Sequence, residues 1–281
     1  PMHAIGARVS YSIVREGQPL DVSVTLGPYP WAENLRQDWG AFAYALAMFF
    51  TGAFVFARRS DDVATRALFV GSSAILGAST WSLGLQALDF VDPLLFWLHR
   101  LTTGGSFLLY WACVLHFTLV FPNPHPLVRR HRWLVPMLYV LPFAVWAATS
   151  WWTGLTAGGV LDALAQQGTY QSLTVVVYLA FSLAALVTNY RNEPSSISRQ
   201  QIRVVIYAIA VNAVLGILLW QIPQLLLGEI WLTSNTIAVI GLILPLALAV
   251  SILRYRLWDI DVFINRTAVY GMLSILIVGL Y

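Results

Sequence analysis

The sequence contains no lysine and only one cysteine. All sixteen basic residues are arginine, so there is no lysine amine to form the Schiff base that a retinal-binding receptor requires. The single cysteine, Cys113, lies inside an apolar run and has no second cysteine to pair with. These absences weaken the case for a rhodopsin-like receptor and exclude a disulfide framework and a cysteine-ligated metal centre.

Charge is also scarce. Charged residues make up 10% and hydrophobic residues 58% of the 281 positions, whereas an average soluble domain has roughly 25% charged residues. The mean hydropathy is +0.70. A soluble chain of this length has too little interior to bury so much apolar surface, so we expect lipid to surround most of it. The net charge of +3 does not indicate nucleic-acid binding, because the arginines sit in short clusters between apolar runs.

The motifs that carry catalysis or nucleotide binding are missing. The chain has no His-Glu-x-x-His, Gly-x-Ser-x-Gly, Gly-x-x-x-x-Gly-Lys or Gly-x-Gly-x-x-Gly sequence. We therefore expect no catalytic residue and no bound cofactor within these 281 residues. Internal repeats and mid-span acids or arginines, which are typical of coupled transporters, are absent too. A small-solute transporter stays an alternative, but a weaker one.

Apolar runs of about twenty residues, the length that crosses roughly 30 Å of hydrocarbon as a helix, dominate the chain. Seven such runs are 39–57, 67–88, 93–121, 133–153, 171–190, 204–224 and 234–253. Another begins near Ala268 and reaches Tyr281, which gives only about 21 Å of helix. The expected fold is an all-α polytopic membrane protein with seven full transmembrane helices, a truncated eighth and a short hairpin-like N-terminal segment.

The arginines alternate between the two sides of the predicted membrane. Twelve of the sixteen fall in the first, third, fifth and seventh loops or at their edges. These are Arg58, Arg59, Arg66, Arg129, Arg130, Arg132, Arg191, Arg199, Arg203, Arg254, Arg256 and Arg266. Positively charged loops stay in the cytoplasm. We therefore expect an extracytoplasmic N-terminus and a cytoplasmic seventh loop.

The segment Arg254–Gly271 reads RYRLWDIDVFINRTAVYG and joins two apolar runs. It resembles the juxtamembrane stretch of bacterial multi-pass sensor histidine kinases, and Ala78–Leu85 and Leu115–Pro122 share part of the likeness. The resemblance implies a signal-input module in the bacterial cytoplasmic membrane that acts in a homodimer. It also implies ATP and magnesium in a separate cytoplasmic kinase domain, with a response regulator as that domain's partner. Related modules carry a phosphatase or a nucleotide cyclase instead, and the sequence leaves these effectors open.

Residues 1–30 differ from the rest of the chain. Val9–Arg15 and Leu20–Leu26 alternate polar and apolar residues around a Glu-Gly-Gln-Pro turn, which predicts a β-hairpin. The pattern is similar to the last strands of a PDZ-like domain, and a disordered leader is the alternative. The predicted domains are an extracytoplasmic remnant at 1–30, a membrane domain at 31–253, a connector at 254–267 and the start of an eighth helix at 268–281.

Three groups of polar residues are candidate functional sites. A rim at the outer ends of the second and third spans combines acids with basic residues, either to cap helices or to meet a signal; it comprises Asp89, Asp92, His99 and Arg100. Within the spans, His116 is expected to form an interhelical hydrogen bond, with Asn212 as a partner. A coupling segment in the seventh loop is expected to contact the effector; it comprises Trp258, Asp259, Asp261, Asn265 and Arg266.

Overall fold

The structure is a computed structural model that describes residues 4–15, 17–83, 93–156, 158, 160–227 and 231–255. The elements are β1 (Arg8–Arg15), β2 (Gln18–Thr25), α1 (Trp31–Gln37), α2 (Trp39–Arg58), α3 (Val63–Ser79), η1 (Thr80–Leu83), α5 (Pro93–Arg100), η2 (Leu101–Gly105), α6 (Ser106–Val120), α7 (Pro126–Arg130), α8 (Leu134–Thr156), α9 (Val160–Asn192), α10 (Ser196–Gly216), η3 (Ile217–Gln221), α11 (Ile222–Leu227), α12 (Ser234–Gly241) and α13 (Ile243–Tyr255). Both η2 and η3 are π-helical turns.

Five helices in the described part of the chain are long and apolar enough to cross a membrane. They are Trp39–Arg58, Leu94–Val120, Leu134–Thr156, Gln166–Asn192 and Ile202–Trp220. The second of these runs from α5 through η2 into α6, and is referred to below as the α5–α6 helix. Two further apolar helices, Val63–Ser79 and Ser234–Ala249, are shorter. The all-helical membrane architecture is thus confirmed, whereas seven complete spans exceed what these lengths show.

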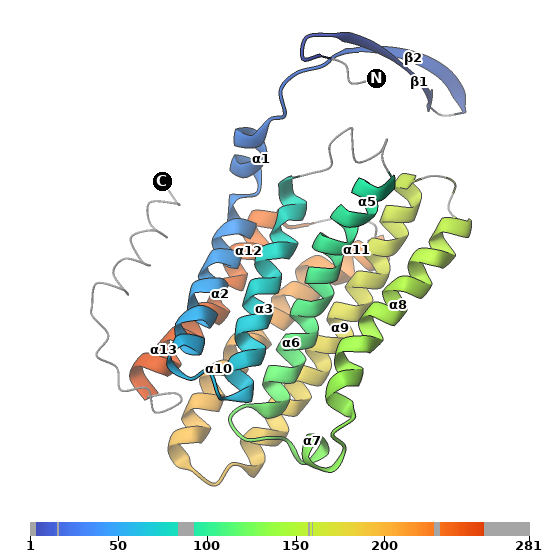
Figure 1. The fold of residues 1–281 in the computed structure, drawn as a ribbon. Coiled ribbons are helices and arrows are strands. Elements are labelled where there is room, and N and C mark those ends of the chain that lie inside the picture. Colours follow the sequence, from blue (N-terminus) through green and yellow to red (C-terminus); the bar gives the residue numbers. More distant parts are fainter. Residues whose placement is uncertain are drawn as a thin grey trace.

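The helices pack as a ring with one helix on its outside. Around the ring, α2 contacts α3, α3 contacts α6, α6 contacts α9, α9 contacts α10, and α10 contacts α13, which returns to α2 together with α12. Helix α8 lies outside this ring against α6 and α9 (Figure 1). The core inside the ring is apolar and includes Met48, Phe117, Leu186, Ile209 and Leu248.

The outward faces of the bundle are apolar as well. Val140 on α8, Phe181 on α9 and Tyr207 on α10 are 64%, 62% and 64% exposed. Large apolar side chains in such numbers on the surface of a soluble protein would drive aggregation, whereas lipid solvates them without cost. The exposed fractions therefore agree with the membrane character that length and composition indicate.

Glycines let the first helices of the ring approach closely. A Cβ atom added to Gly52 of α2 would lie 2.2 Å from Ser72 Oγ of α3. A Cβ added to Gly71 of α3 would lie 2.8 Å from the Cβ of Cys113 on α6. Small residues at helix contacts are the usual means of close packing in membranes. Helix α3 is held between α2 and α6 in this way.

The predicted β-hairpin is confirmed with nearly the expected bounds. Strands β1 and β2 pair antiparallel with Tyr11 opposite Val22 and Ile13 opposite Leu20. They lie beyond the end of the bundle where α1 is found (Figure 1). Helix α1, which the sequence pattern did not predict, is fixed by the Asn34 amide, which donates to the Leu83 carbonyl at 2.8 Å.

Residues 160–170 also differ from the expectation. The fifth apolar run begins at residue 171, and residues 154–169 before it are expected to form a short interfacial helix of their own, but the structure extends helix α9 back to Val160. Polar residues such as Gln166 and Gln167 lower the hydropathy of this stretch without breaking the helix, because glutamine is a good helix former. The extension brings Gln167 into the bundle, where it is buried.

Candidate functional site

The two ends of the bundle differ in charge. The loop between α2 and α3, helix α7, the loop between α9 and α10 and the end of α13 lie at one end, and the hairpin lies at the other (Figure 1). The first three arginine groups of the sequence are at the former end, and all nine of their side chains are exposed. We call this the arginine end, and the opposite one the hairpin end.

A buried arginine lies among three helices near the hairpin end. Arg100 of α5 is 5% exposed, and Gln167 of α9 is 6% exposed. The guanidinium of Arg100 donates through Nη2 to Gln167 Oε1. The amide of Gln167 in turn donates to Ser150 Oγ of α8 at 2.5 Å. One hydrogen-bonded chain therefore links α5, α9 and α8.

A second layer lies one helical turn further into the bundle on the same three helices. Its members, Gly104, Trp146 and Gln171, are each four residues from a member of the first layer, and residues at this spacing share a helix face. A Cβ on Gly104 would lie 3.4 Å from Gln171 Nε2 and 3.8 Å from Trp146 Nε1. The Trp146 indole N–H is buried and has no hydrogen-bond partner among the described residues. We call both layers together the Arg100 cluster.

The π-helical turn η2 lies inside this cluster. It spans Leu101–Gly105, between Arg100 and α6, and the Thr103 hydroxyl donates to the His99 carbonyl at 2.8 Å. Turns of this kind are uncommon and occur frequently at functional sites, because they alter which side chains a helix presents. Across this turn, Arg100 bonds to Gln167 of α9, and Gly104 lies beside Gln171 of α9 and Trp146 of α8.

The predicted rim is only partly visible. Asp89 and Asp92 lie outside the described residues. Arg100 is in the interior between helices rather than on an exposed rim, because its guanidinium turns toward Gln167. His99 is half-buried. Arg100, which the sequence suggested for the surface, therefore belongs to a buried polar cluster.

A second polar cluster, in which Asn189 and Glu193 are buried, lies near the arginine end. The Asn189 amide of α9 donates to the carbonyls of Thr118 and Phe121, at 3.1 and 2.9 Å. Directly after the end of α9, Glu193 is 6% exposed and accepts from Asn123 Nδ2 at 2.9 Å. We call Asn123, Asn189 and Glu193 with these carbonyls the Glu193 cluster. It ties the end of α9 to the end of α6 and the loop after it.

The same loop contains a buried histidine. His125 is 7% exposed, and its Nδ1 accepts from the Leu127 N–H at 3.2 Å as the N-cap of α7. The backbone N–H of His125 donates to the Leu119 carbonyl at 2.8 Å. Burial lowers the pKa of His125 below its usual value. The neutral imidazole is the form that can accept this capping bond.

His116 is paired with a residue that the sequence did not suggest. Its Nδ1 lies 2.8 Å from the Tyr139 hydroxyl of α8, and the two rings meet edge to face. Asn212 instead donates to the Ala208 carbonyl of its own helix at 2.9 Å. The expected His116–Asn212 pair is therefore not formed, because His116 faces α8 on the outside of the ring while Asn212 is on α10.

The coupling segment cannot be placed. Trp258, Asp259, Asp261, Asn265 and Arg266 lie outside the described residues, as does the predicted eighth helix at 268–281. In the part of the chain that is described, no three histidine, cysteine or acidic side chains lie close enough to hold a metal ion.

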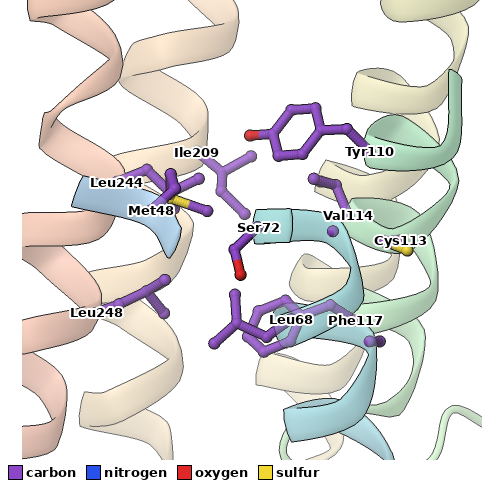
Figure 2. A pocket seen from close by; sticks show the side chains of 12 residues that line it. Met48, Leu68, Ser72, Tyr110, Cys113, Val114, Phe117, Ile209, Leu244 and Leu248 are labelled. Carbon is purple, nitrogen blue, oxygen red and sulfur yellow. The ribbon is translucent and has the colours of Figure 1, made fainter. Parts of the chain in front are cut away.

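A small cavity opens inside the ring. It measures about 20 Å³ and is lined by α2, α3, α6, α10 and α13. Figure 2 shows Met48, Ile209 and Leu244 facing Ser72 and Tyr110 across this space. Its volume is close to the minimum for one water molecule, but a water also needs polar partners, and the surface that the lining residues turn to the cavity is apolar although Ser72 and Tyr110 are among them. The cavity is a packing feature rather than a ligand site.

The sequence pattern missed most residues of both clusters. Gln167 and Gln171 lie four residues apart on α9. This spacing places the pair on one face of a helix, which is a signal that the sequence contains. This signal was missed because the fifth span was taken to begin at residue 171, apart from a short interfacial helix before it, so that Gln167 and Gln171 were not recognised as parts of one helix.

The chain has no match among protein-family models, curated proteins or solved structures. The geometry of the two clusters and the sequence pattern therefore carry the functional argument.

Proposed function

We propose that this chain is the signal-input membrane module of a bacterial receptor, and that its effector is a histidine kinase. The arginine end faces the cytoplasm and the hairpin end faces outward, in accordance with the positive-inside rule. In this arrangement the helices α3 and α12–α13 complete a set of seven spans. The module acts in a homodimer, and the effector passes its output to a response regulator.

One observation carries this proposal: helix α9 is tied to the α5–α6 helix near both of its ends. Gln167 is bonded to Arg100 near the hairpin end, and Asn189 is bonded to the backbone at Thr118 and Phe121 near the arginine end. The order of these contacts shows that the two helices run parallel. A structural change at one cluster is therefore transmitted to the other along these two hydrogen-bonded helices.

Such an arrangement suits transmission across a membrane. A signal can change the receptor only if it interacts differently with two states of the protein. The Arg100 cluster offers a charged, hydrogen-bonded set of side chains whose contacts a signal can alter. An ionisable residue buried within a membrane costs free energy, which makes it a candidate for a functional role. The Glu193 cluster holds the loops on the effector side. The connector 254–267, by its resemblance to sensor kinases, carries the change onward.

The experiment uses the full-length protein in inside-out membrane vesicles and measures incorporation of phosphate from radiolabelled ATP. Arg100→Gln is expected to change the basal rate, because it removes the charge from the Arg100 cluster. Arg36→Gln, a change at an exposed position of α1, is the matched control and is expected to leave the rate unaltered. A full-length protein that incorporates no phosphate would exclude the kinase and leave a phosphatase or a cyclase as the effector.

A transporter is the second candidate and makes an opposite prediction. The buried Arg100 is the observation in its favour, since charged residues in spans also mark solute pathways. Saturable uptake of a solute by liposomes that contain the chain, lost in Arg100→Gln, would support transport and displace the receptor. The receptor hypothesis requires that no such uptake occurs.

A further inference from the structure

The second arginine group at the arginine end lies in a segment without acids. Its members, Arg129, Arg130 and Arg132, lie in helix α7 and directly after it, and their side chains are exposed. The sequence has no aspartate or glutamate between Asp92 and Asp162. In the described part of the chain, none of the three arginines makes an ion pair or a side-chain hydrogen bond. Their N–H donors are therefore available to a partner.

The other two arginine groups at this end are accompanied by acids. In the first group, Arg66 Nη2 lies 3.7 Å from Asp61 Oδ1, and Asp62 is the N-cap of α3. In the third group, Glu193 lies in the same loop, and its carbonyl accepts from Arg199 Nε at 2.5 Å. Of the three groups, the second therefore presents the positive charge with the least compensation from the chain itself.

Two large apolar side chains lie beside these arginines. Leu127 of α7 and Trp133, which directly precedes α8, are both more than half exposed. Apolar and aromatic side chains next to arginines are typical of segments that lie in the interface between membrane and water. We call Leu127, Arg129, Arg130, Arg132 and Trp133 together the α7 surface.

The α7 surface is held at the level where two spans end. Residues 121–133 join the α5–α6 helix to α8, and both of these helices are long and apolar enough to cross a membrane. The bond from the His125 N–H to the Leu119 carbonyl keeps α7 against the end of α6 (Figure 1). Helix α8 presents most of its surface to lipid: of its residues, all of which are described, only Pro142 and Thr153 are buried. Lipid headgroups are therefore the nearest surroundings of the α7 surface.

We propose that the α7 surface binds anionic phospholipid in the leaflet at the arginine end. The guanidinium groups donate charge-assisted hydrogen bonds to the lipid phosphates. Leu127 and Trp133 enter the layer between the headgroups and the acyl chains. An acidic protein segment would attract the same arginines, but it would not supply the apolar layer that these two side chains require. The binding does not depend on the receptor function.

The experiment measures which lipids lie next to Trp133. The full chain is reconstituted in phosphatidylcholine vesicles that contain a minor fraction of phosphatidylglycerol. In one preparation the acyl chains of the phosphatidylglycerol carry bromine, which quenches tryptophan fluorescence on contact. In the other preparation an equal fraction of the phosphatidylcholine carries the bromine. The same measurement with Trp133→Phe in each background is subtracted, so that the difference reports Trp133 alone.

Brominated phosphatidylglycerol is expected to quench Trp133 about fivefold more strongly than brominated phosphatidylcholine, because a single arginine near an anionic surface gives a preference of about this size. Changing the three arginines together, as Arg129→Gln, Arg130→Gln and Arg132→Gln, is expected to make the two lipids quench equally. Lysine at the same three positions keeps the charge and is expected to keep most of the preference.

The first arginine group offers a control with the same change in net charge. The variant that combines Arg58→Gln, Arg59→Gln and Arg66→Gln also removes three positive charges from the arginine end. It is expected to keep the preference of Trp133 for phosphatidylglycerol, because these side chains belong to another loop.

Equal quenching by the two lipids in the wild type would overturn the proposal. An equal loss of preference in both glutamine variants would overturn it too, since only net charge would then be at work. A loss in the lysine variant as large as in its glutamine counterpart would exclude charge as the cause. Polyglutamate on both sides of the vesicle membrane is the last arm: a preference that it abolishes would assign the α7 surface to an acidic protein segment, and an unaltered preference supports the lipid. None of these results bears on whether the full-length protein is a kinase.

Discussion

The side-chain amide of Asn123 and the carboxylate of Glu193 lie 2.9 Å apart, although seventy residues separate them in the sequence. The first follows the α5–α6 helix, and the second follows α9. Glu193 Oε1 also accepts from the Ser195 N–H at 3.4 Å, and the Glu193 carbonyl accepts from Arg199 Nε at 2.5 Å. One residue thus fixes the loop before α7 and the turn into α10.

Replacing this carboxylate is expected to destabilise the bundle. Glu193→Ala removes the acceptor of the Asn123 amide, and because Asn123 is exposed and its amide can bond to water, the expected cost is that of one hydrogen bond, about 0.5–1.5 kcal/mol. Glu193→Gln keeps one acceptor oxygen, so it should cost less. Thermal unfolding in a mild detergent measures both, with the exposed Glu33→Ala as the control. If Glu193→Ala unfolds at the wild-type temperature, the Glu193 cluster does not hold these loops together.

Stability is expected to fall in mild acid because of His125. Burial lowers its pKa in the folded protein below the ordinary value of 6.5. The unfolded chain therefore binds a proton at a higher pH than the folded chain. The contribution of neutral His125 is fully present above pH 6.5 and is lost as the pH falls from there through the lowered pKa.

His125→Asn tests this dependence, since asparagine caps helices but does not titrate. Unfolding temperatures are measured from pH 7.5 down to pH 5 for the wild type and the variant. The wild type should lose more stability over this interval than the variant. Parallel curves for the two proteins would mean that the protonation of His125 is not coupled to folding.

Adding a side-chain atom at the close contact between α2 and α3 is expected to lower the stability of the bundle. In Gly52→Ala the new Cβ would lie 2.2 Å from Ser72 Oγ, so the helices must move apart at a cost of about 1–3 kcal/mol. Gly216→Ala is the control, because no atom lies within 4 Å of its new Cβ. In a helix this second change should stabilise by up to about 1 kcal/mol. Equal unfolding temperatures for the two variants would contradict the packing of α2 on α3.

The orientation in the membrane can be tested with single cysteines in a Cys113→Ala background. Thr156 at the end of α8 and Arg130 in α7 are both exposed and lie at opposite ends of the bundle. A membrane-impermeant thiol reagent applied to intact cells should label Thr156→Cys and not Arg130→Cys. The reverse pattern would place the arginine end outside.

The apolar spacing of the sequence predicted the helical elements well, because a helix that crosses lipid requires a long uninterrupted apolar run. The hairpin was also predictable, since Tyr11 and Ile13 alternate with serines. What the sequence did not predict is which helices touch. The pairing of His116 with Tyr139 depends on α8 lying against α6, and no local pattern encodes that neighbour.

The functional clusters were harder to predict for a related reason. Arg100 was identified as a candidate, but its position near a span end suggested a solvated rim. Its guanidinium bonds to Gln167, which the hydropathy pattern placed outside the fifth span. A polar residue at the edge of an apolar run is ambiguous between water and the bundle interior until the neighbouring helices are known.

The amphipathic hairpin has a practical consequence for handling the protein. Its apolar face leaves Tyr11, Ile13, Leu20 and Val24 each more than 40% exposed, and the described residues place nothing over that face. Two-stranded ribbons of this kind present unpaired strand edges and an exposed apolar face to other copies of the chain, and both features promote aggregation. A chain trimmed to begin at Gly27 should therefore stay dispersed, by light scattering, at concentrations where the 281-residue chain self-associates.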